Sequence, residues 1–236
     1  MLLSLILQIT EGVANTAAAI PTAAEQAPKQ DALSLLDLML KGGYFMIPIG
    51  ILSIISIYVL IEKYIAIKRA GRLNPDFMNN IKENIKKGNL EGASSVCKNS
   101  PSAVSTVIEK GIVRIGKPIK EIEGAMESIG KLEVSKMEKN LSILGIIAGI
   151  APMFGFIGTI SGVIKIFYKI SLADNIKISD ISEGLYEKMI TSASGLVVGV
   201  FAFVSYHYLN LLIDRVIYKI EASSVEFIDV LQDPKA

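Results

Sequence analysis

The stretch that most constrains this chain runs from Met189 to Ile213 and contains no Lys, Arg, Asp or Glu. A helix needs about 20 consecutive apolar residues to cross the hydrocarbon core of a bilayer, so this stretch is long enough to span a membrane. Its first half is rich in small and hydroxyl-bearing residues, namely Thr191, Ser192, Ser194, Gly195 and Gly199. Small residues let helices approach closely within a membrane, whereas a helix that faces only lipid has no need of them. The stretch therefore predicts a spanning helix packed among other helices.

Two other stretches, Tyr44–Ile61 and Asn140–Ile164, are also free of charged residues and long enough to span. Apolar residues make up 51% of the chain. Soluble proteins reach roughly 45–50% even when glycine is counted among the apolar residues. The chain is therefore predicted to be an all-α integral membrane protein, with three transmembrane helices and long cytoplasmic helical extensions.

Basic residues collect on one side of the first spanning stretch. The flank that follows it carries Lys63, Lys68, Arg69 and Arg72, whereas the flank before it has more acidic than basic residues. Basic residues next to membrane spans favour the cytoplasmic side. The first helix is therefore predicted to run from outside to inside, which places the N-terminus outside and the C-terminus in the cytoplasm.

The predicted organisation has eight segments. In chain order they are an external N-terminal segment with some features of a signal peptide (1–30), an amphipathic surface helix (31–43), transmembrane helix 1 (44–67), a cytoplasmic helical domain (68–139), transmembrane helix 2 (140–168), an external loop (169–179), transmembrane helix 3 (180–213) and a cytoplasmic C-terminal helix and tail (214–236). The apolar periodicity of residues 122–141 predicts an amphipathic helix that runs straight into the second span.

Glu187 is the acidic residue that stands out. Helical spacing of apolar residues from Ile178 predicts that the third span begins near Asp180, which puts Glu187 about two turns, roughly 10 Å, along the helix. Carboxylates at membrane depth are costly and usually face a protein interior or a wet pathway. On the same helix Thr191 and Ser192 follow about one turn later, and hydroxyl groups can both donate to and accept from water. With Thr159 from the second span, these residues are the candidate proton pathway.

Plainer interpretations remain open for the same residues. An acid in the first turns of a helix is favoured by the helix dipole, and Lys188 is its direct neighbour. The small residues can serve packing alone, without lining a pore. Pro152 removes a backbone donor and is expected to kink the second span. The candidate packing residues are Gly145, Gly149, Gly155, Gly158, Gly162, Gly195, Gly199 and Pro152.

Composition argues against several other classes of protein. Cys97 is the single cysteine, so neither an intrachain disulfide nor a cysteine metal site can form. His207 is the single histidine, which excludes a multi-histidine zinc centre. A net charge of +1 provides no electrostatic footprint for nucleic acid. We therefore expect no metal, no cofactor, no nucleic-acid partner and no enzymatic activity.

The membrane part of the chain holds one carboxylate where a proton carrier usually needs two titratable groups. Apart from acids that flank the ends of the spans, Glu187 is alone. A second titratable group or a moving partner would separate proton uptake from release. If the chain conducts protons, another subunit must therefore take part.

Two motifs then give a family resemblance. The stretches Ala151-Pro-Met-Phe-Gly-Phe-Ile-Gly-Thr-Ile-Ser-Gly162 and Ile181-Ser-Glu-Gly-Leu-Tyr-Glu-Lys-Met-Ile-Thr-Ser-Ala-Ser-Gly-Leu196 resemble the MotA/TolQ/ExbB proton-channel family, and ExbB-type biopolymer transport proteins most closely. The resemblance extends over about Gly42 to Asp214. By position, Glu187 resembles the family's pore glutamate, and Thr159 and Ser192 resemble its polar pore residues. Ser192 replaces the usual threonine, and Lys188 stands where alanine is common.

The resemblance implies more than the residues can show. It implies a homopentamer in the bacterial inner membrane around the helices of an ExbD/TolR-type single-span subunit with a membrane aspartate. Proton-motive force would then drive work through a TonB-type protein to the outer membrane. A TolQ-like or gliding-motility stator subunit and a non-conducting membrane scaffold remain the alternatives. MotA-type chains carry four spans, which fits the three predicted here less well.

Overall fold

The structure is a computed structural model that describes residues 43–172 and 178–232. The side chains of Ser179, Asp180, Glu183 and Glu187 fall outside this description, although their backbone belongs to a described helix. The predicted N-terminal segment (1–30), nearly all of the surface helix (31–43) and the centre of the external loop (173–177) also lie outside the described residues.

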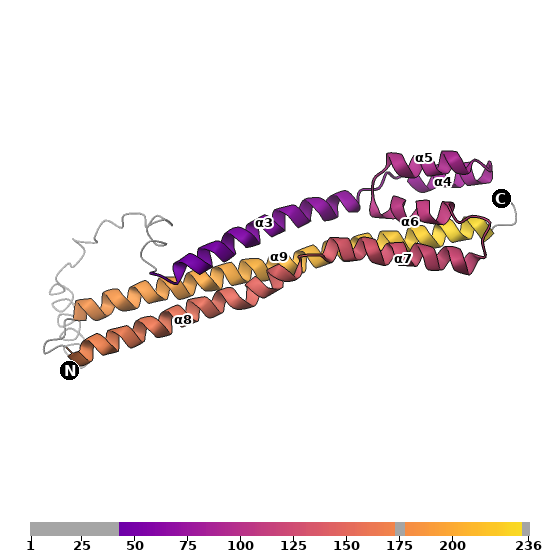
Figure 1. Cartoon of the computed structure of the whole chain (residues 1–236). Coiled ribbons are helices and arrows are strands. Elements are labelled where there is room, and N and C mark those ends of the chain that lie inside the picture. The colour runs from indigo at the N-terminus through magenta and orange to yellow at the C-terminus, as the bar shows by residue number, and fades with distance from the viewer. Residues whose placement is uncertain (1–42, 173–177, 233–236) are drawn as a thin grey trace, which may run out of the picture. The chain divides into compact units, whose positions relative to one another are not determined.

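The described residues form helices and contain no strand. The helices are α3 (Met46–Ala70), α4 (Phe77–Lys86), α5 (Leu90–Asn99), α6 (Ala103–Ile112), α7 (Ile119–Glu138), α8 (Ser142–Leu172) and α9 (Ile178–Gln232) (Figure 1). Three helical stretches of the described chain are long and apolar enough to cross a membrane, and they include α3, α8 and the N-terminal part of α9. The predicted all-α membrane fold with three spanning helices is confirmed.

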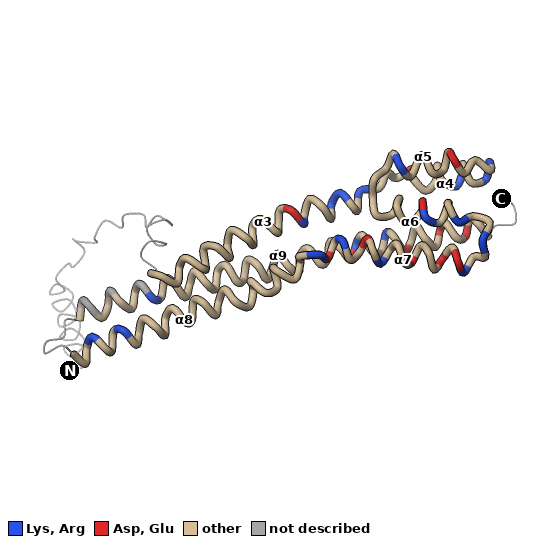
Figure 2. Tube along the Cα trace, in the orientation of Figure 1, with Lys and Arg blue, Asp and Glu red and all other residues tan. Residues whose placement is uncertain are grey.

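Charge divides the described chain into two regions. Figure 2 shows few charged residues along α8 and the adjoining part of α9, and many along α4 to α7 and the part of α9 beside them. In the first region α8 packs along α9, and α3 packs on both. A small buried cluster of Ile147, Ala151 and Ala202 lies between α8 and α9, with Leu52 of α3 packed against it. The spanning helices therefore form one packed group.

The spanning helix α3 buries one stripe of side chains. Its buried residues are Met46, Ile49, Ser56, Val59, Lys63 and Ile67, at intervals of three, four or seven residues. This spacing keeps them on one face of a helix. Large apolar side chains on other faces, such as Ile47, Ile54 and Tyr58, are exposed in the isolated chain. These faces are therefore available to lipid or to other subunits.

The second region is a helical domain built on the C-terminal half of α9. Its core is one cluster of buried side chains that includes Phe77, Ile81, Val104, Ile108 and Phe227. An ion pair between Lys82 and Glu226 at 2.5 Å joins α4 to α9. Burial of large apolar side chains, each contributing about 1.5–3 kcal/mol, is the main term that holds this domain together.

Two of the short helices begin at side-chain caps. Ser102 accepts a hydrogen bond from the backbone N–H of Ser105 at 3.1 Å, and the Ser105 hydroxyl accepts one from the backbone N–H of Ser102 at 2.9 Å. This reciprocal pair is a capping box at the start of α6. At the start of α5, Asn89 Oδ1 accepts a hydrogen bond from the Gly92 N–H at 2.9 Å. These caps fix where the chain turns between helices.

The chain breaks between α7 and α8, where we expected one continuous helix. Helix α7 ends at Glu138, and Asn140 has a φ of 66°, in the left-handed region. Asparagine tolerates this conformation better than most residues because its short polar side chain can bond locally. Leu141, directly after the turn, is buried in the core. Helix α7 of the helical domain and α8, the second span, are therefore separate elements.

Helix α9 is continuous from the membrane region into the helical domain. Its 55 residues correspond to about 80 Å at 1.5 Å per residue. About three quarters of the way along it, Lys219 Nζ donates a hydrogen bond to the carbonyl oxygen of Gly71, just after α3, at 3.0 Å. One rigid element thus links the third span to the core of the domain.

Cys97 lies in this core and is 3% exposed. Burial raises the pKa of its thiol to about 12, and the nearby Glu109 carboxylate acts in the same direction. The reactive form of cysteine is the thiolate. We expect iodoacetamide at pH 8 to alkylate Cys97 at least about tenfold more slowly in the folded protein than in the SDS-denatured chain. Mass spectrometry of the intact protein over time measures both rates, and equal rates would contradict the buried, protonated thiol.

Candidate functional site

Helices α8 and α9 approach each other until their backbones touch. A Cβ atom built on Gly195 would lie 2.6 Å from the carbonyl oxygen of Ala151 and 3.0 Å from Cα of Gly155. A Cβ on Gly155 would lie 3.0 Å from the carbonyl oxygen of Ser192. Real Cβ atoms essentially never lie closer than 3.0 Å to backbone, so position 195 requires glycine, and a Cβ at position 155 would be in unusually tight contact. We call this contact, formed by Ala151, Gly155, Gly158, Gly162, Thr191, Ser192, Gly195 and Gly199, the α8–α9 seam.

Thr191 lies inside the seam. Its side chain is 0% exposed. A Cβ on Gly158 would lie 2.9 Å from Cγ2 of Thr191 and 3.3 Å from Cβ of Phe45. The missing side chain of Gly158 thus leaves room for the threonine methyl group, beside the residue that precedes α3. All three spanning helices meet near this point.

Thr159 and Ser192 lie at the edge of the seam, and both are half-buried. The Thr159 hydroxyl donates to the carbonyl oxygens of Phe156 at 2.8 Å and Gly155 at 3.1 Å. Gly155 also faces the backbone of Ser192, so it connects the two hydroxyl-bearing residues. Gly155 and Gly158 of α8 thus pack against Ser192 and Thr191 of α9, and Thr159 bonds to the carbonyl oxygen of Gly155 in its own helix.

Glu187 precedes Thr191 by four residues in α9, which is about one helical turn. Its side chain lies outside the described residues. The next residue, Lys188, is partly buried, and its alkyl chain crosses Gly162 of α8. A Cβ on Gly162 would come within 2.1–2.4 Å of three carbon atoms of that chain. Lysine stems bury readily along apolar surface while the charged group stays near water.

The other predicted packing residues have different surroundings. A Cβ on Gly199 would lie 2.5 Å from the ring of Pro152, which remains inside α8 without ending it. A Cβ on Gly145 would make ordinary contact, 3.8 Å, with the ring of Tyr206. A Cβ on Gly149 would meet nothing within 4 Å in the described chain. Gly199 therefore faces α8, Gly145 faces α9 more loosely, and Gly149 faces away.

Sequence reasoning missed three residues of the membrane region. Gly184 contacts Ile166 of α8, where a Cβ would lie 2.8 Å from the isoleucine Cδ1. It precedes Gly195 by 11 residues, three helical turns, so periodicity could have revealed it. Lys63 is 5% exposed, and Ser56 is fully buried with no hydrogen-bond partner for its hydroxyl among the described residues. No sequence pattern marked the buried face of α3.

No group of three or more His, Cys, Asp and Glu residues in the described chain could hold a metal ion. The seam holds hydroxyl groups and glycines, and its candidate acid is Glu187 at the neighbouring turn of α9. Half-buried hydroxyl groups at the edge of the seam, such as those of Thr159 and Ser192, can donate to and accept from water.

Comparison with known proteins shows which family the sequence belongs to. Residues 99–222 match the MotA/TolQ/ExbB proton channel family. The chain belongs to this family. The matched residues extend from the end of α5 to well past the membrane part of α9. They include the seam and Glu187, so the resemblance seen in the two motifs is confirmed.

Individual MotA/TolQ/ExbB relatives support the assignment. A putative biopolymer transport protein ExbB homolog of Methanothermobacter thermautotrophicus is 30% identical over 80% of this chain and 67% of the relative. A putative biopolymer transport protein ExbB-like 1 of Synechocystis is 24% identical over 82% of this chain and 74% of the relative. The Tol-Pal system protein TolQ of Haemophilus influenzae is 26% identical over 40% of this chain and 43% of the relative. With its three apolar helices, the chain is a multi-pass membrane protein of the MotA/TolQ/ExbB type.

The seam makes a test with a matched control possible. We expect Gly195→Ala to destabilise the protein by about 1–3 kcal/mol, because the new methyl group would overlap backbone atoms that cannot move independently. Gly149→Ala meets open space and should be neutral or slightly stabilising, since alanine favours the helix. Thermal unfolding of both variants in the same detergent measures the difference. Equal melting temperatures would contradict the close backbone contact.

Proposed function

We propose that this chain is the proton-channel subunit of an inner-membrane energy-transducing complex of the ExbB–ExbD–TonB type. Membership of a proton channel family and the ExbB names of two relatives support this proposal. The observation that carries it is that Thr191 and Ser192, about one turn after Glu187 on α9, pack against Gly155 and Gly158 of α8, the helix that carries Thr159. In this proposal, proton-motive force powers outer-membrane transport.

Glu187 is the group that binds and releases the proton. The seam itself is too tight for water, because its backbones are in contact. Protons would therefore move along the edge of the seam, where Thr159 and Ser192 are half-buried. The Thr159 hydroxyl now bonds to carbonyl oxygens of its own helix. It would rotate away from them to join a chain of waters, at the modest cost of a local hydrogen bond.

A second subunit completes the site in this proposal. One carboxylate can hold a proton but cannot separate its uptake from its release. A single-span protein of the ExbD/TolR type would supply the second one, a membrane aspartate. Several copies of this chain, five by family resemblance, would surround that partner. The exposed apolar faces of α3, α8 and α9 leave room for such contacts and for lipid.

The proposed orientation places residues 1–30 and 169–179 in the periplasm, and residues 68–139 and 214–236 in the cytoplasm. Basic residues gather where α3 leaves the membrane region (Figure 2). They are Lys63, Lys68, Arg69 and Arg72. An excess of Lys and Arg marks the cytoplasmic side of a span. The complex would then lie in the inner membrane of a bacterial cell.

A TolQ-like role is the second candidate, and the similarity to a Tol-Pal system protein TolQ favours it. Both roles use the same proton site and differ in the partner. A non-conducting scaffold would explain the seam equally well but leaves Glu187 without a task. Proton flux therefore separates the scaffold from the other two, and the identity of the partner separates those from each other.

The first functional prediction concerns Glu187. Glu187→Gln keeps the shape of the side chain but removes its titratable group, so we expect proton flux through the assembled complex to fall to background. Glu183→Gln, one turn earlier on the same helix, is the matched control and should retain flux. The measurement is acidification of proteoliposomes that contain the chain and its single-span partner. Wild-type flux in Glu187→Gln would exclude the channel role.

The second functional prediction concerns Ser192. Ser192→Thr keeps the hydroxyl and should retain flux. Ser192→Val has nearly the same shape as threonine but no hydroxyl, so we expect roughly tenfold lower flux, which corresponds to about 1.4 kcal/mol. The same proteoliposome assay compares them. Equal flux in the two variants would remove Ser192 from the pathway.

A further inference from the structure

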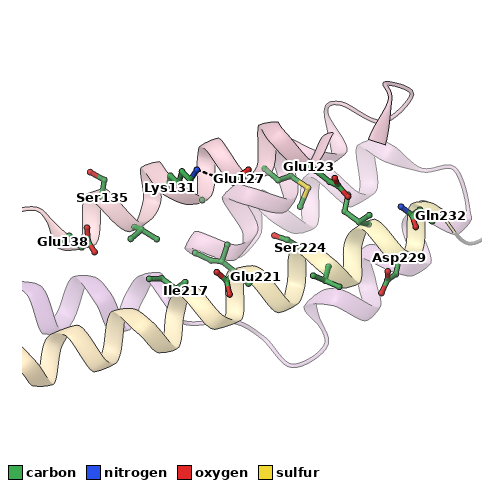
Figure 3. Close-up of a pocket in the computed structure, with 16 residues that line it drawn as sticks. Glu123, Glu127, Lys131, Ser135, Glu138, Ile217, Glu221, Ser224, Asp229 and Gln232 are labelled. Atoms are coloured by element: carbon green, nitrogen blue, oxygen red, sulfur yellow. Dashed lines mark ion pairs between the residues drawn. The ribbon is translucent and has the colours of Figure 1, made fainter. Parts of the chain in front are cut away.

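A groove runs between α7 and the C-terminal part of α9, away from the spanning helices (Figure 3). Its volume is about 720 Å³. One end lies at Glu123 and Gln232 and the other at Glu138 and Ile217. Each wall therefore covers about four helical turns, or roughly 22 Å. This length matches a helix of about 15 residues.

The floor of the groove is apolar. Met126 of α7 and Ile220 and Ile228 of α9 are buried there, and Val134 is partly buried. Gly130 keeps the floor low, because a Cβ on it would be in ordinary contact with Ile220, at 3.7 Å. Grooves of this kind accept the apolar face of an amphipathic helix, which anchors at helical spacing.

The rim of the groove is acidic on both walls. Five carboxylates line it, Glu123, Glu127 and Glu138 from α7 and Glu221 and Asp229 from α9, against a single base, Lys131. Lys131 is already engaged, since its Nζ lies 2.6 Å from Oε1 of Glu127. The other four carboxylates form no ion pair with a residue of the described chain. An occupant therefore needs an apolar face with cations along both of its flanks.

A second copy of this chain matches these requirements poorly. On α9 beyond the third span, the large exposed apolar side chains are Tyr218 and Val225, and Val225 itself lines the groove. Asp214 and Glu221 flank these two residues together with basic residues, so this face carries no excess of cations. Helix α4 has two lysines, but its apolar face is already buried in the core. Charge complementarity thus favours a different polypeptide.

We propose that the α7–α9 groove is the docking site for a basic amphipathic helix of about 15 residues that belongs to a different cytoplasmic polypeptide. Its apolar side chains rest on Met126, Ile220 and Ile228, and its lysines or arginines pair with the carboxylates of the two walls. Since α9 continues into the third span, an occupant of this groove would contact the same helix that carries Glu187. The proposal does not depend on proton conduction and stands or falls separately from it.

Peptide binding to the full-length protein tests the proposal. The probe is a fluorescent 15-residue helical peptide with leucines at positions i, i+3, i+4, i+7, i+8 and i+11 and lysines on both flanks. The protein is held in nanodiscs of neutral lipid, which do not attract the cationic peptide. We expect binding detected by fluorescence anisotropy that weakens as salt is raised, because salt screens charge pairing. A peptide with glutamates in place of the lysines should not bind.

Variants locate the bound peptide. The triple variant Glu138→Gln, Glu221→Gln, Asp229→Asn should weaken binding by about tenfold or more, because it removes carboxylates from both walls. The matched control neutralises exposed acids outside the groove, Glu91→Gln with Glu121→Gln, and should leave binding unchanged. Gly130→Leu fills the floor and should also weaken binding, whereas Gly130→Ala should not. No binding of the basic peptide, or equal losses in triple variant and control, would overturn the proposal.

Crosslinking decides between a partner and a second copy. Ser224 is half-buried in the groove. The variant Ser224→Cys, in a Cys97→Ala background, is treated with a thiol-specific crosslinker in membranes of the producing cells. If the main product is a dimer of this chain, the groove is an interface between copies and the proposal is wrong. If the added basic peptide protects this cysteine from alkylation in nanodiscs, the groove is the peptide's site, as proposed.

Discussion

The contact between the backbones of α8 and α9 is the constraint on which the membrane region depends. Within a bilayer, helices gain little from hydrophobic burial, because lipid is as apolar as their side chains. Close van der Waals contact must therefore hold them together. Glycines at positions 155 and 195 allow this contact, because a Cβ would overlap backbone at position 195 and crowd it at position 155. The same closeness excludes water from the seam and leaves its hydroxyl-bearing edge as the place where a proton could pass.

Helix α9 carries this constraint beyond the membrane. It forms one wall of the seam, and its C-terminal half builds the core of the helical domain around Phe227. A helix resists bending because each turn is held by several hydrogen bonds, so a displacement at one end reaches the other. The turn at Asn140 separates α7 from α8, so the second span has no such continuity. The proposed proton site and the proposed docking groove would therefore communicate through α9.

Much of the membrane architecture could be predicted from the sequence because lipid imposes simple rules. Uncharged stretches of sufficient length indicated the three spans, and the motif around Pro152 and the register of Glu187 with Gly195 indicated the family; the structure and the comparisons confirm both. The role of Glu187 stays a prediction. The break at Asn140 was not predicted, because apolar residues keep helical spacing across it and hide the left-handed turn at this residue.

By itself the sequence determined which segments enter the membrane, because the cost of placing charge in lipid is set by residue type alone. It also predicted Glu187 as the centre of a proton site, because no other carboxylate lies within a span away from its ends. Only the tertiary structure decided which glycines touch a neighbouring helix, since Gly149 and Gly155 look alike in sequence but face opposite surroundings. It also decided that carboxylates from two distant segments share one groove, because their proximity arises from the packing of α7 on α9.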